Sequence, residues 1–246
     1  MIILPNKKDA IHKAWLYRIL EEIADDPYLP AVLYFKGGTC ASMLGWLDRF
    51  SVDLDFDYAG GEKDIEKTRT ALCTIFKKLG LVIKDESKNG IQYFLKYENI
   101  GRNTIKLETA FPLFKSSKYA PERFAEIDRI LICQTKETMF AHKLSALQDR
   151  YKKTGHVAGR DIYDIHHFFM KGYEYNIAII KERSRKEVKD FFSDLILFIE
   201  NNVTDKVIAE DLNPLLLPDK FSYMRKFIKR ETLSLIRDEV LRLKKL

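Results

Sequence analysis

A stretch in which polar and apolar residues strictly alternate, from position 49 to position 56, constrains this chain more than any other feature. Such alternation predicts a half-buried β-strand, because successive side chains point to opposite faces. The polar set is Arg49, Ser51, Asp53 and Asp55, and the apolar set is Phe50, Val52, Leu54 and Phe56. Same-side residues lie about 6.6 Å apart on a strand. Asp53 and Asp55 could therefore share divalent cations, which need hard oxygen ligands.

A pair of glycines lies ahead of this segment. The apolar run 31–35 predicts a buried strand that breaks at Gly37-Gly38, and we expect Thr39 to cap a short helix over 39–47. A glycine turn leading into a helix N-terminus presents backbone N–H groups and partial positive charge, which suits a triphosphate. Together the turn and the two carboxylates indicate a phosphoryl- or nucleotidyl-transfer site. The alternative for alternating acids is a solvated strand face.

The composition is that of a folded protein. With 246 residues, of which 46% are hydrophobic and 32% charged, the chain has room for one large domain or two modest ones. We expect no signal peptide, because the apolar run at the start is short. We also expect no membrane span, because the apolar stretch 191–199 is half the necessary length. Three widely spaced cysteines (Cys40, Cys73 and Cys133) suit a reducing cytoplasm, and we expect all three to be buried.

The charge is moderately basic. The net charge of +6 and the isoelectric point near 9.0 permit nucleic-acid binding. Basic residues concentrate over 143–160, with Tyr151 among them. There, contact with a phosphate backbone and a solvated helix face are both open. The basic pairs near the C-terminus are predicted to be solvated.

The order of elements predicts an α+β fold, with a mixed sheet flanked by helices and then a helical lobe. We expect helices over 6–26, 39–47, 64–79, 137–151, 160–171, 184–202 and 219–245. We expect strands over 31–35, 49–56, 81–84, 91–97, 104–109 and 129–133, with the last at a sheet edge and a hairpin around Lys88-Asn89-Gly90. The predicted domains are 1–135 and 136–246, the second completing an active-site cleft.

Charged residues outside the opening segment extend the candidate site. Glu108 lies on the polar face of its strand and is the candidate third carboxylate for a second metal, although a solvated glutamate is equally open. Lys143 and Arg150 share a helix face and could clamp a triphosphate. Asp161 could orient Lys143 or the nucleotide, or else Asp161 or Asp164 could cap the next helix.

Four motifs occur in order across residues 35–165. They are Gly37-Gly38-Thr39, Arg49-Phe-Ser51-Val-Asp53-Leu-Asp55-Phe56, Lys143-Leu-Ser-Ala-Leu147-Gln-Asp-Arg150, and Arg160-Asp161-Ile-Tyr-Asp164. In these motifs the chain resembles the AbiEii-type nucleotidyltransferase toxins of bacterial type IV toxin–antitoxin and abortive-infection systems. The resemblance implies a polymerase-β-like nucleotidyltransferase fold, Mg²⁺ (or Mn²⁺) and an NTP donor.

The same resemblance implies roles for individual residues. Asp53 and Asp55 would bind metal, Arg49 and Ser51 would lie close to the nucleotide, and Lys143 and Asp161 would form a second catalytic pair. One departure is Glu108, since the superfamily often has aspartate as the third carboxylate. Some relatives modify the acceptor end of tRNA, and relatives are usually encoded beside an antitoxin. Expected partners are therefore NTP, tRNA or another RNA, and a cognate antitoxin.

The sequence thus predicts a cytoplasmic, metal-dependent nucleotidyltransferase toxin that transfers NMP from an NTP to an RNA, with the tRNA 3′ end as the expected acceptor. Transfer to a small molecule or a protein hydroxyl stays open, because only the acceptor differs. A degenerate fold acting as a binding module would predict lost carboxylates or a lost glycine turn. A metal-dependent nuclease could use Asp53, Asp55 and Glu108 but would have no need for that turn.

Overall fold

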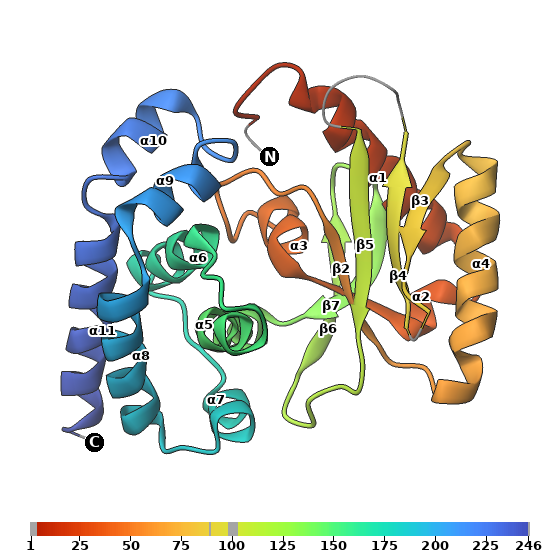
Figure 1. Cartoon of the computed structure of the whole chain (residues 1–246). Helices are drawn as coiled ribbons and strands as arrows, with labels where there is room; N and C mark the ends of the chain where they lie inside the picture. The colour runs from red at the N-terminus through yellow and green to blue at the C-terminus, as the bar shows by residue number, and fades with distance from the viewer. Residues whose placement is uncertain (1–3, 89, 98–102, 246) are drawn as a thin grey trace. The chain divides into compact units, whose positions relative to one another are not determined.

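The structure is a computed structural model that describes residues 4–88, 90–97 and 103–245 (Figure 1). The contacts of the chain divide it into two compact units. The sheet unit comprises Met1–Leu113 and Lys118–Thr135, and the helical unit comprises Phe114–Ser117 and Lys136–Leu246. This division differs from a single cut at 135, because the short segment Phe114–Ser117 joins the helical unit.

The sheet unit contains a mixed β-sheet and its flanking helices, and its α+β character confirms the predicted fold class. Its helices are α1 (Asp9–Asp25), α2 (Leu29–Val32), α3 (Gly37–Met43), a 3₁₀ turn (Glu62–Asp64) and α4 (Ile65–Lys78). Its strands are β1 (Leu33–Lys36), β2 (Leu54–Tyr58), β3 (Val82–Glu86), β4 (Gln92–Lys96), β5 (Thr104–Ala110), β6 (Tyr119–Phe124) and β7 (Arg129–Gln134).

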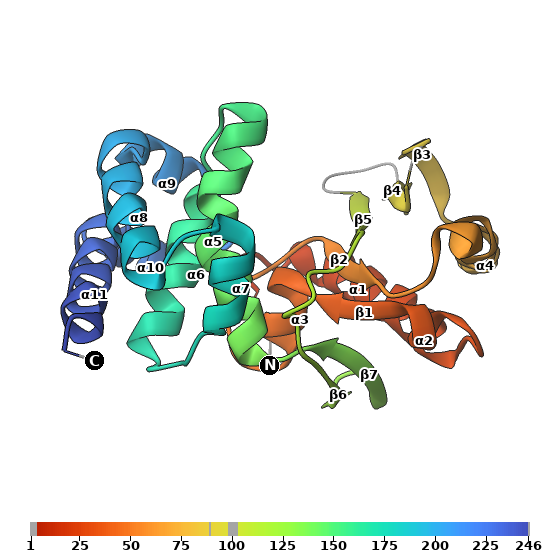
Figure 2. The ribbon, with the colours of Figure 1, turned by 90° about the horizontal axis from the view of Figure 1, so that it is seen from below.

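In the described part of the chain, seven strands form one sheet in the order β3-β4-β5-β2-β1-β7-β6. Strand β2 runs antiparallel to β1 and parallel to β5, and β1 is parallel to β7. In Figure 2, β4 and β5 are seen nearly end-on while β1 lies more nearly lengthwise, so the sheet is strongly twisted. The crossovers place β2 between β1 and β5, in the middle of the sheet.

One face of this sheet is apolar and the other carries charge. Register pairs Phe35 with Phe56 and Leu54 with Leu107, and all four side chains are fully buried. Helix α1 packs its own buried stripe in the same core, and α4 contributes Phe76, whose ring meets Tyr93 edge-on. The opposite face presents Lys36, Asp55, Asp57, Lys106 and Glu108. The alternation of the sequence thus positions the candidate site on one side of the sheet.

The helical unit contains α5 (Lys136–Thr154), α6 (Gly159–Met170), α7 (Ile177–Ser184), α8 (Val188–Asn202), α9 (Asp205–Leu212), α10 (Pro218–Met224) and α11 (Ile228–Leu243). Aromatic rings form much of its core, where Phe140 meets Phe168, Phe169 and Tyr175 at centroid distances of 5.0–6.0 Å. Gly159 lets α6 approach α9 closely, because a Cβ there would lie 2.6 Å from the Ile208 backbone.

The fold corrects several expected elements. The expected edge strand 129–133 is β7, which lies between β1 and β6, so β6 is the true edge. The apolar run 31–35 begins in α2 and becomes strand only at Leu33. Strand β6 and helices α7 and α9 were not predicted, and the expected helix 219–245 divides into α10 and α11. The hairpin of β3 and β4 is confirmed, although its predicted turn includes Asn89, which lies outside the described residues.

Candidate active site

The site is organised around the backbone of Gly37, where β1 ends and α3 begins. Gly37 has φ +79°, and a Cβ built there would lie 2.2 Å from Asp55 Oδ2. No L side chain fits both the backbone conformation and the close carboxylate. Glycine at this position therefore allows the Asp55 carboxylate to lie directly against the main chain.

The second glycine brings two more predicted residues to the turn. A Cβ on Gly38 would lie 2.7 Å from Ser51 Oγ and 3.1 Å from Arg49 Nη2. Arg49, Ser51 and Asp55 thus line the same short piece of backbone. The structure brings together residues that the sequence grouped only by motif, with a guanidinium, a hydroxyl and a carboxylate next to the glycine pair.

Residues 49–53 reach this position as irregular chain, since β2 begins only at Leu54. The prediction of a continuous strand over 49–56 was wrong in its first half. Side chains of α3 hold the segment: Ser42 Oγ donates to Arg49 O at 2.7 Å, and Thr39 Oγ1 donates to Asp53 O at 2.5 Å. Thr39 therefore lies inside α3 and fixes the acidic segment, instead of capping the helix as predicted.

His12 of α1 holds the same segment from another direction, and sequence reasoning missed it. Its Nε2 lies 2.9 Å from Val52 O and its Nδ1 lies 2.9 Å from Tyr97 Oη. Because a carbonyl only accepts, Nε2 donates to Val52 O, and in the neutral imidazole this leaves Nδ1 to accept from the tyrosine hydroxyl. The sequence signal that could have identified His12 is its position four residues before Leu16, which puts both on the buried face of α1.

Asp57 continues the alternation of Asp53 and Asp55 but has a different environment. Its Oδ1 accepts from Lys36 Nζ at 2.7 Å, and its Oδ2 accepts from Tyr119 Oη at 2.8 Å and Gln134 Nε2 at 2.6 Å. It is nearly fully buried. A carboxylate with three donors and little access to water is a structural anion, and it anchors Lys36 next to the glycine turn.

Glu108 of β5 lies directly across from Asp55 in the parallel register of β2 and β5. Its carboxylate forms an ion pair with Lys106 of the same strand. Within residues 4–88, 90–97 and 103–245, no three His, Cys, Asp or Glu side chains gather closely enough to hold a metal ion. A two-carboxylate set fits Mg²⁺ well, since Mg²⁺ commonly takes one or two protein carboxylates and completes its shell with water and substrate phosphates. Asp53 and Asp55 are two carboxylates of the kind that this pattern needs, and the roles of Asp53, Asp55 and Glu108 as metal ligands all stay predictions.

The cysteines take no part in this chemistry. Cys40 of α3 and Cys133 of β7 are buried as predicted, and Cys73 is half-buried. Burial raises the pKa of the Cys40 thiol well above its ordinary value, and the neighbouring Cys133 thiol raises it further. Cys40 is therefore a neutral packing residue beneath the glycine turn.

In the helical unit, two ion pairs join α5 to α6. Lys143 Nζ lies 2.7 Å from Asp164 Oδ2, and Arg150 Nε lies 3.3 Å from Asp161 Oδ2. Both carboxylates are almost completely buried. The expectation that Asp161 orients Lys143 is thus corrected, because Asp164 holds the lysine and Asp161 holds the arginine. Neither aspartate caps α6, whose first N–H (Gly159) donates to Asp211 Oδ2 at 2.7 Å.

The candidate residues therefore fall into two groups, one in each unit. Arg49, Ser51 and Asp55 lie against the glycine turn of the sheet unit, and Thr39 of α3 holds the main-chain carbonyl of Asp53. Lys143 and Arg150, each held by a buried aspartate, belong to the helical unit. The roles of Lys143 and Arg150 in the site stay predictions, and sequence reasoning missed Asp164 as the partner of Lys143.

Comparison with known families decides the relationship. The sequence model described as "Nucleotidyl transferase AbiEii toxin, Type IV TA system" matches residues 18–224, most of the chain. The chain belongs to the AbiEii toxin family. The resemblance inferred from the four motifs is thereby confirmed, and the type IV system implies a cognate antitoxin for this AbiEii toxin.

Solved structures show the same fold. A candidate nucleotidyltransferase from H. pylori is 19% identical with a TM-score of 0.58, and the alignment covers 98% of each chain. JHP933 from Helicobacter pylori is also 19% identical, with a TM-score of 0.57. The alignment covers 99% of this chain and 96% of JHP933. Comparison with curated proteins gives no match. Among the described residues of this AbiEii toxin, none of the helices has the length and apolar character needed to cross a bilayer.

Proposed function

We propose that this AbiEii-family toxin transfers a nucleoside monophosphate from an NTP to the 3′ end of a tRNA and so blocks translation in the cytoplasm. One observation carries the proposal: the backbone of Gly37-Gly38 is bordered by the side chains of Asp55, Ser51 and Arg49 at close range. Phosphates need backbone and guanidinium donors, and a metal on those phosphates needs carboxylates. The site offers both in one place.

The residues at the glycine turn have distinct tasks in this proposal. The N–H groups of the turn and the Ser51 hydroxyl donate to the triphosphate of the NTP, and the Arg49 guanidinium supplies positive charge nearby. Asp53 and Asp55 would hold Mg²⁺, which supplies charge stabilisation of the triphosphate when bound. His12, Thr39 and Ser42 keep the acidic segment in position through its main-chain carbonyls.

Lys143, Arg150 and Asp161 complete the proposal from the helical unit. During transfer the oxygen of the acceptor hydroxyl forms a bond to the α-phosphorus and its proton passes to water. The bond between the α-phosphorus and the oxygen that bridges to the β-phosphate breaks, and pyrophosphate leaves with that oxygen and the negative charge. A lysine and an arginine that are already positioned by buried aspartates could stabilise this charge without further ordering. In that role Lys143 would act directly and Asp161 would position Arg150.

Label transfer tests the proposal. The protein is incubated with Mg²⁺, total tRNA and each NTP labelled at the α-phosphate, and the RNA is separated from protein and small molecules. We expect label on the RNA with at least one NTP. Asp55→Asn should lower the rate at least ~100-fold, because a preorganised charged group is lost from the site. Asp85→Asn, which removes an exposed carboxylate of β3, is the matched control and should leave the rate unchanged.

The acceptor is tested with tRNA whose terminal 2′,3′-diol has been destroyed by periodate. Loss of labelling with this tRNA supports the 3′ end as acceptor, and unchanged labelling would exclude it. Label that appears on protein or on a small molecule instead would favour the other acceptor classes. No label on RNA with any of the four nucleotides would overturn the proposal.

A further inference from the structure

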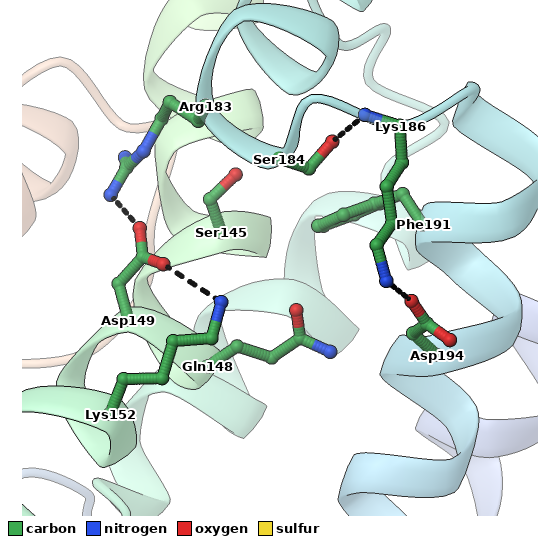
Figure 3. A pocket seen from close by; sticks show the side chains of 9 residues that line it. All are labelled: Ser145, Gln148, Asp149, Lys152, Arg183, Ser184, Lys186, Phe191 and Asp194. Atoms are coloured by element: carbon green, nitrogen blue, oxygen red, sulfur yellow. Dashed lines mark hydrogen bonds and ion pairs between the residues drawn. The ribbon is translucent and has the colours of Figure 1, made fainter.

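A groove in the helical unit lies between α5 and α8, on the side of α5 away from Lys143. It consists of an inner cavity of about 40 Å³ and an open part of about 330 Å³. The two parts share Gln148, Lys152, Lys186 and Asp194, so they form one continuous depression. We call it the α5–α8 groove, and Figure 3 shows its inner end.

Helix geometry separates the groove from the proposed catalytic cations. At 3.6 residues per turn, Gln148 and Lys152 point roughly opposite to Lys143 on α5. Lys143 and Arg150 face α6, where Asp164 and Asp161 hold them. Side chains of the groove can therefore be altered without touching either ion pair.

An aromatic pair forms part of the open end of the groove. Tyr151 and Phe198 meet edge-on, with ring centroids 5.3 Å apart and an interplanar angle of 72°. Tyr151 is 38% exposed, and the neighbouring Leu197 is also open to solvent. An accessible aromatic ring in an amphipathic groove is a platform on which an unpaired nucleobase can stack, and stacking tolerates any base.

Cations lie beside this platform. Lys152 is 73% exposed, and its nearest carboxylate, Asp149, is 3.9 Å away. Such an exposed pair contributes little stability, so the ammonium can turn to a phosphate at small cost. Lys186 pairs with Asp194, and Arg183 is fixed by Asp149 at 2.7 Å (Figure 3). Three cations against two carboxylates leave the inner end with an excess positive charge.

Amide side chains supply the remaining polar groups. Gln148 of α5 and Asn201 of α8 line the open part. An amide both donates and accepts, so it can pair with the edge of any base. The open part, at about 330 Å³, is within the size range of small-ligand sites, which begins at about 300 Å³. Its aromatic platform, amides and flexible lysine match the base and the phosphate of one nucleotide.

We propose that the α5–α8 groove binds one nucleotide of a single-stranded RNA, with the base against Tyr151 and the phosphate beside Lys152. The inference rests on the proposed function in taking RNA as the substrate. A duplex would not fit, because its bases are already stacked inside the helix and its edges are paired. The groove would thus hold unpaired nucleotides of the acceptor RNA at a place separate from the transfer site.

Binding is measured directly, without catalysis. The full chain carrying Asp55→Asn is titrated into a labelled mixed-sequence RNA of about ten nucleotides, within the span that single-strand binding proteins cover, and fluorescence anisotropy gives Kd at several salt concentrations. We expect Tyr151→Leu, which keeps apolar packing against Phe198, to raise Kd roughly 5- to 100-fold. Thermal melting confirms that this variant folds.

A charge-matched pair tests the lysine. Lys152→Glu should raise Kd several-fold and reduce the slope of log Kd against log salt by roughly 0.7 for each phosphate that the protein no longer neutralises. Lys206→Glu is the control: this α9 lysine is 82% exposed and also has a carboxylate 3.9 Å away, but it lies outside the groove. Its Kd and salt slope should match the parent.

The outcomes are distinct. Equal Kd for Tyr151→Leu, Lys152→Glu and the parent would overturn the inference, as would equal binding of duplex and single strand. A free mononucleotide that competes as strongly as the oligonucleotide would make the groove a small-molecule site and also overturn it. Failure of label transfer to RNA leaves these binding results unaffected, whereas RNA labelling with an inert groove would reject the inference alone.

Discussion

The two units position their candidate residues by different physical means. In the sheet unit the absence of a side chain is decisive, because the Asp55 carboxylate occupies the space that a Cβ on Gly37 would fill. In the helical unit the decisive elements are side chains, since buried Asp164 and Asp161 hold Lys143 and Arg150. The comparison teaches that the sheet unit tolerates no added side-chain atom at Gly37, whereas the helical unit depends on charge balance. Removal of a cation there should therefore lower the stability of the fold as well as the rate of transfer.

The largest effect is expected at Gly37. Gly37→Ala places a methyl group 2.2 Å from Asp55 Oδ2 and should lower nucleotidyl transfer at least ~100-fold, because displacement of a reacting group by about 1 Å costs that much. Gly80→Ala is the matched control: φ is +70°, but a Cβ meets no described atom within 4 Å. It should lose about 1–2 kcal/mol of stability with unchanged activity. Equal losses of activity in Gly37→Ala and Gly80→Ala would show that backbone strain at positive φ, and not the clash with the Asp55 carboxylate, explains the effect at Gly37.

The charge balance of the helical unit is tested by removing one cation at a time. Lys143→Met removes the ammonium that lies 2.7 Å from the fully buried Asp164 carboxylate and should lower the free energy of unfolding by about 3–5 kcal/mol. Arg150→Met also leaves a buried carboxylate, Asp161, but it should cost less than Lys143→Met, because the Arg150 side chain is 41% exposed to water and its ion pair is longer, at 3.3 Å. Urea denaturation gives both values. Similar losses for the two variants would break the contrast between the pairs.

His12 tests whether the sheet unit also depends on side chains at a distance. His12→Phe removes the donor to Val52 O and should cost about 1–3 kcal/mol, with a fall in kcat, because the carbonyl beside Asp53 is left unsatisfied. His12→Gln can place an amide N–H where Nε2 lies and should recover most of kcat. Steady-state kinetics distinguishes this from simple destabilisation, since a packing role alone would not favour Gln over Phe.

The smallest effect concerns the pH dependence of the helical unit. Burial raises the pKa of Glu239, but hydrogen bonds from Arg242 and Tyr175 outweigh it and hold the pKa below its ordinary value. A carboxylate whose pKa is lower in the folded state stabilises the fold above the unfolded pKa, and this contribution is lost as the pH falls. As the pH falls from neutral to below about 4, we therefore expect Glu239→Gln to lose less stability than the parent does. Glu187→Gln, an exposed carboxylate paired with Lys181, should follow the parent profile.

Local patterns predicted the glycine turn and its association with Asp55, because both have short-range signatures. The metal-binding role of Asp53 and Asp55 stays a prediction. The predicted strand begins too early in the sequence. Residues 49–53 alternate between polar and apolar types as a strand does, but they are irregular, and β2 begins at Leu54. There, α3 hydroxyls and His12 replace the hydrogen bonds of a neighbouring strand. Those bonds join residues from different elements, 7 to 40 positions apart in sequence, and no local pattern reports them.

The helical unit shows a different limit. Asp161 and Asp164 are three residues apart, so both lie on the inner face of α6, and spacing alone does not decide which one meets Lys143. Strand β6 was missed because its central residues are Pro121, Glu122 and Arg123, which are typical of a loop. An edge strand tolerates them, since one side of its backbone needs no partner strand.

The short segment Phe114–Ser117 has a consequence for how the protein is made. Its backbone N–H groups at Lys115 and Ser116 both donate to the Glu182 carboxylate, which is encoded 67 and 66 residues later. A ribosome adding roughly 5–20 residues per second completes the sheet unit's last strand well before that carboxylate exists. The nascent chain therefore carries this loop without its anchor for several seconds. A product that terminates at Thr135 would never acquire it.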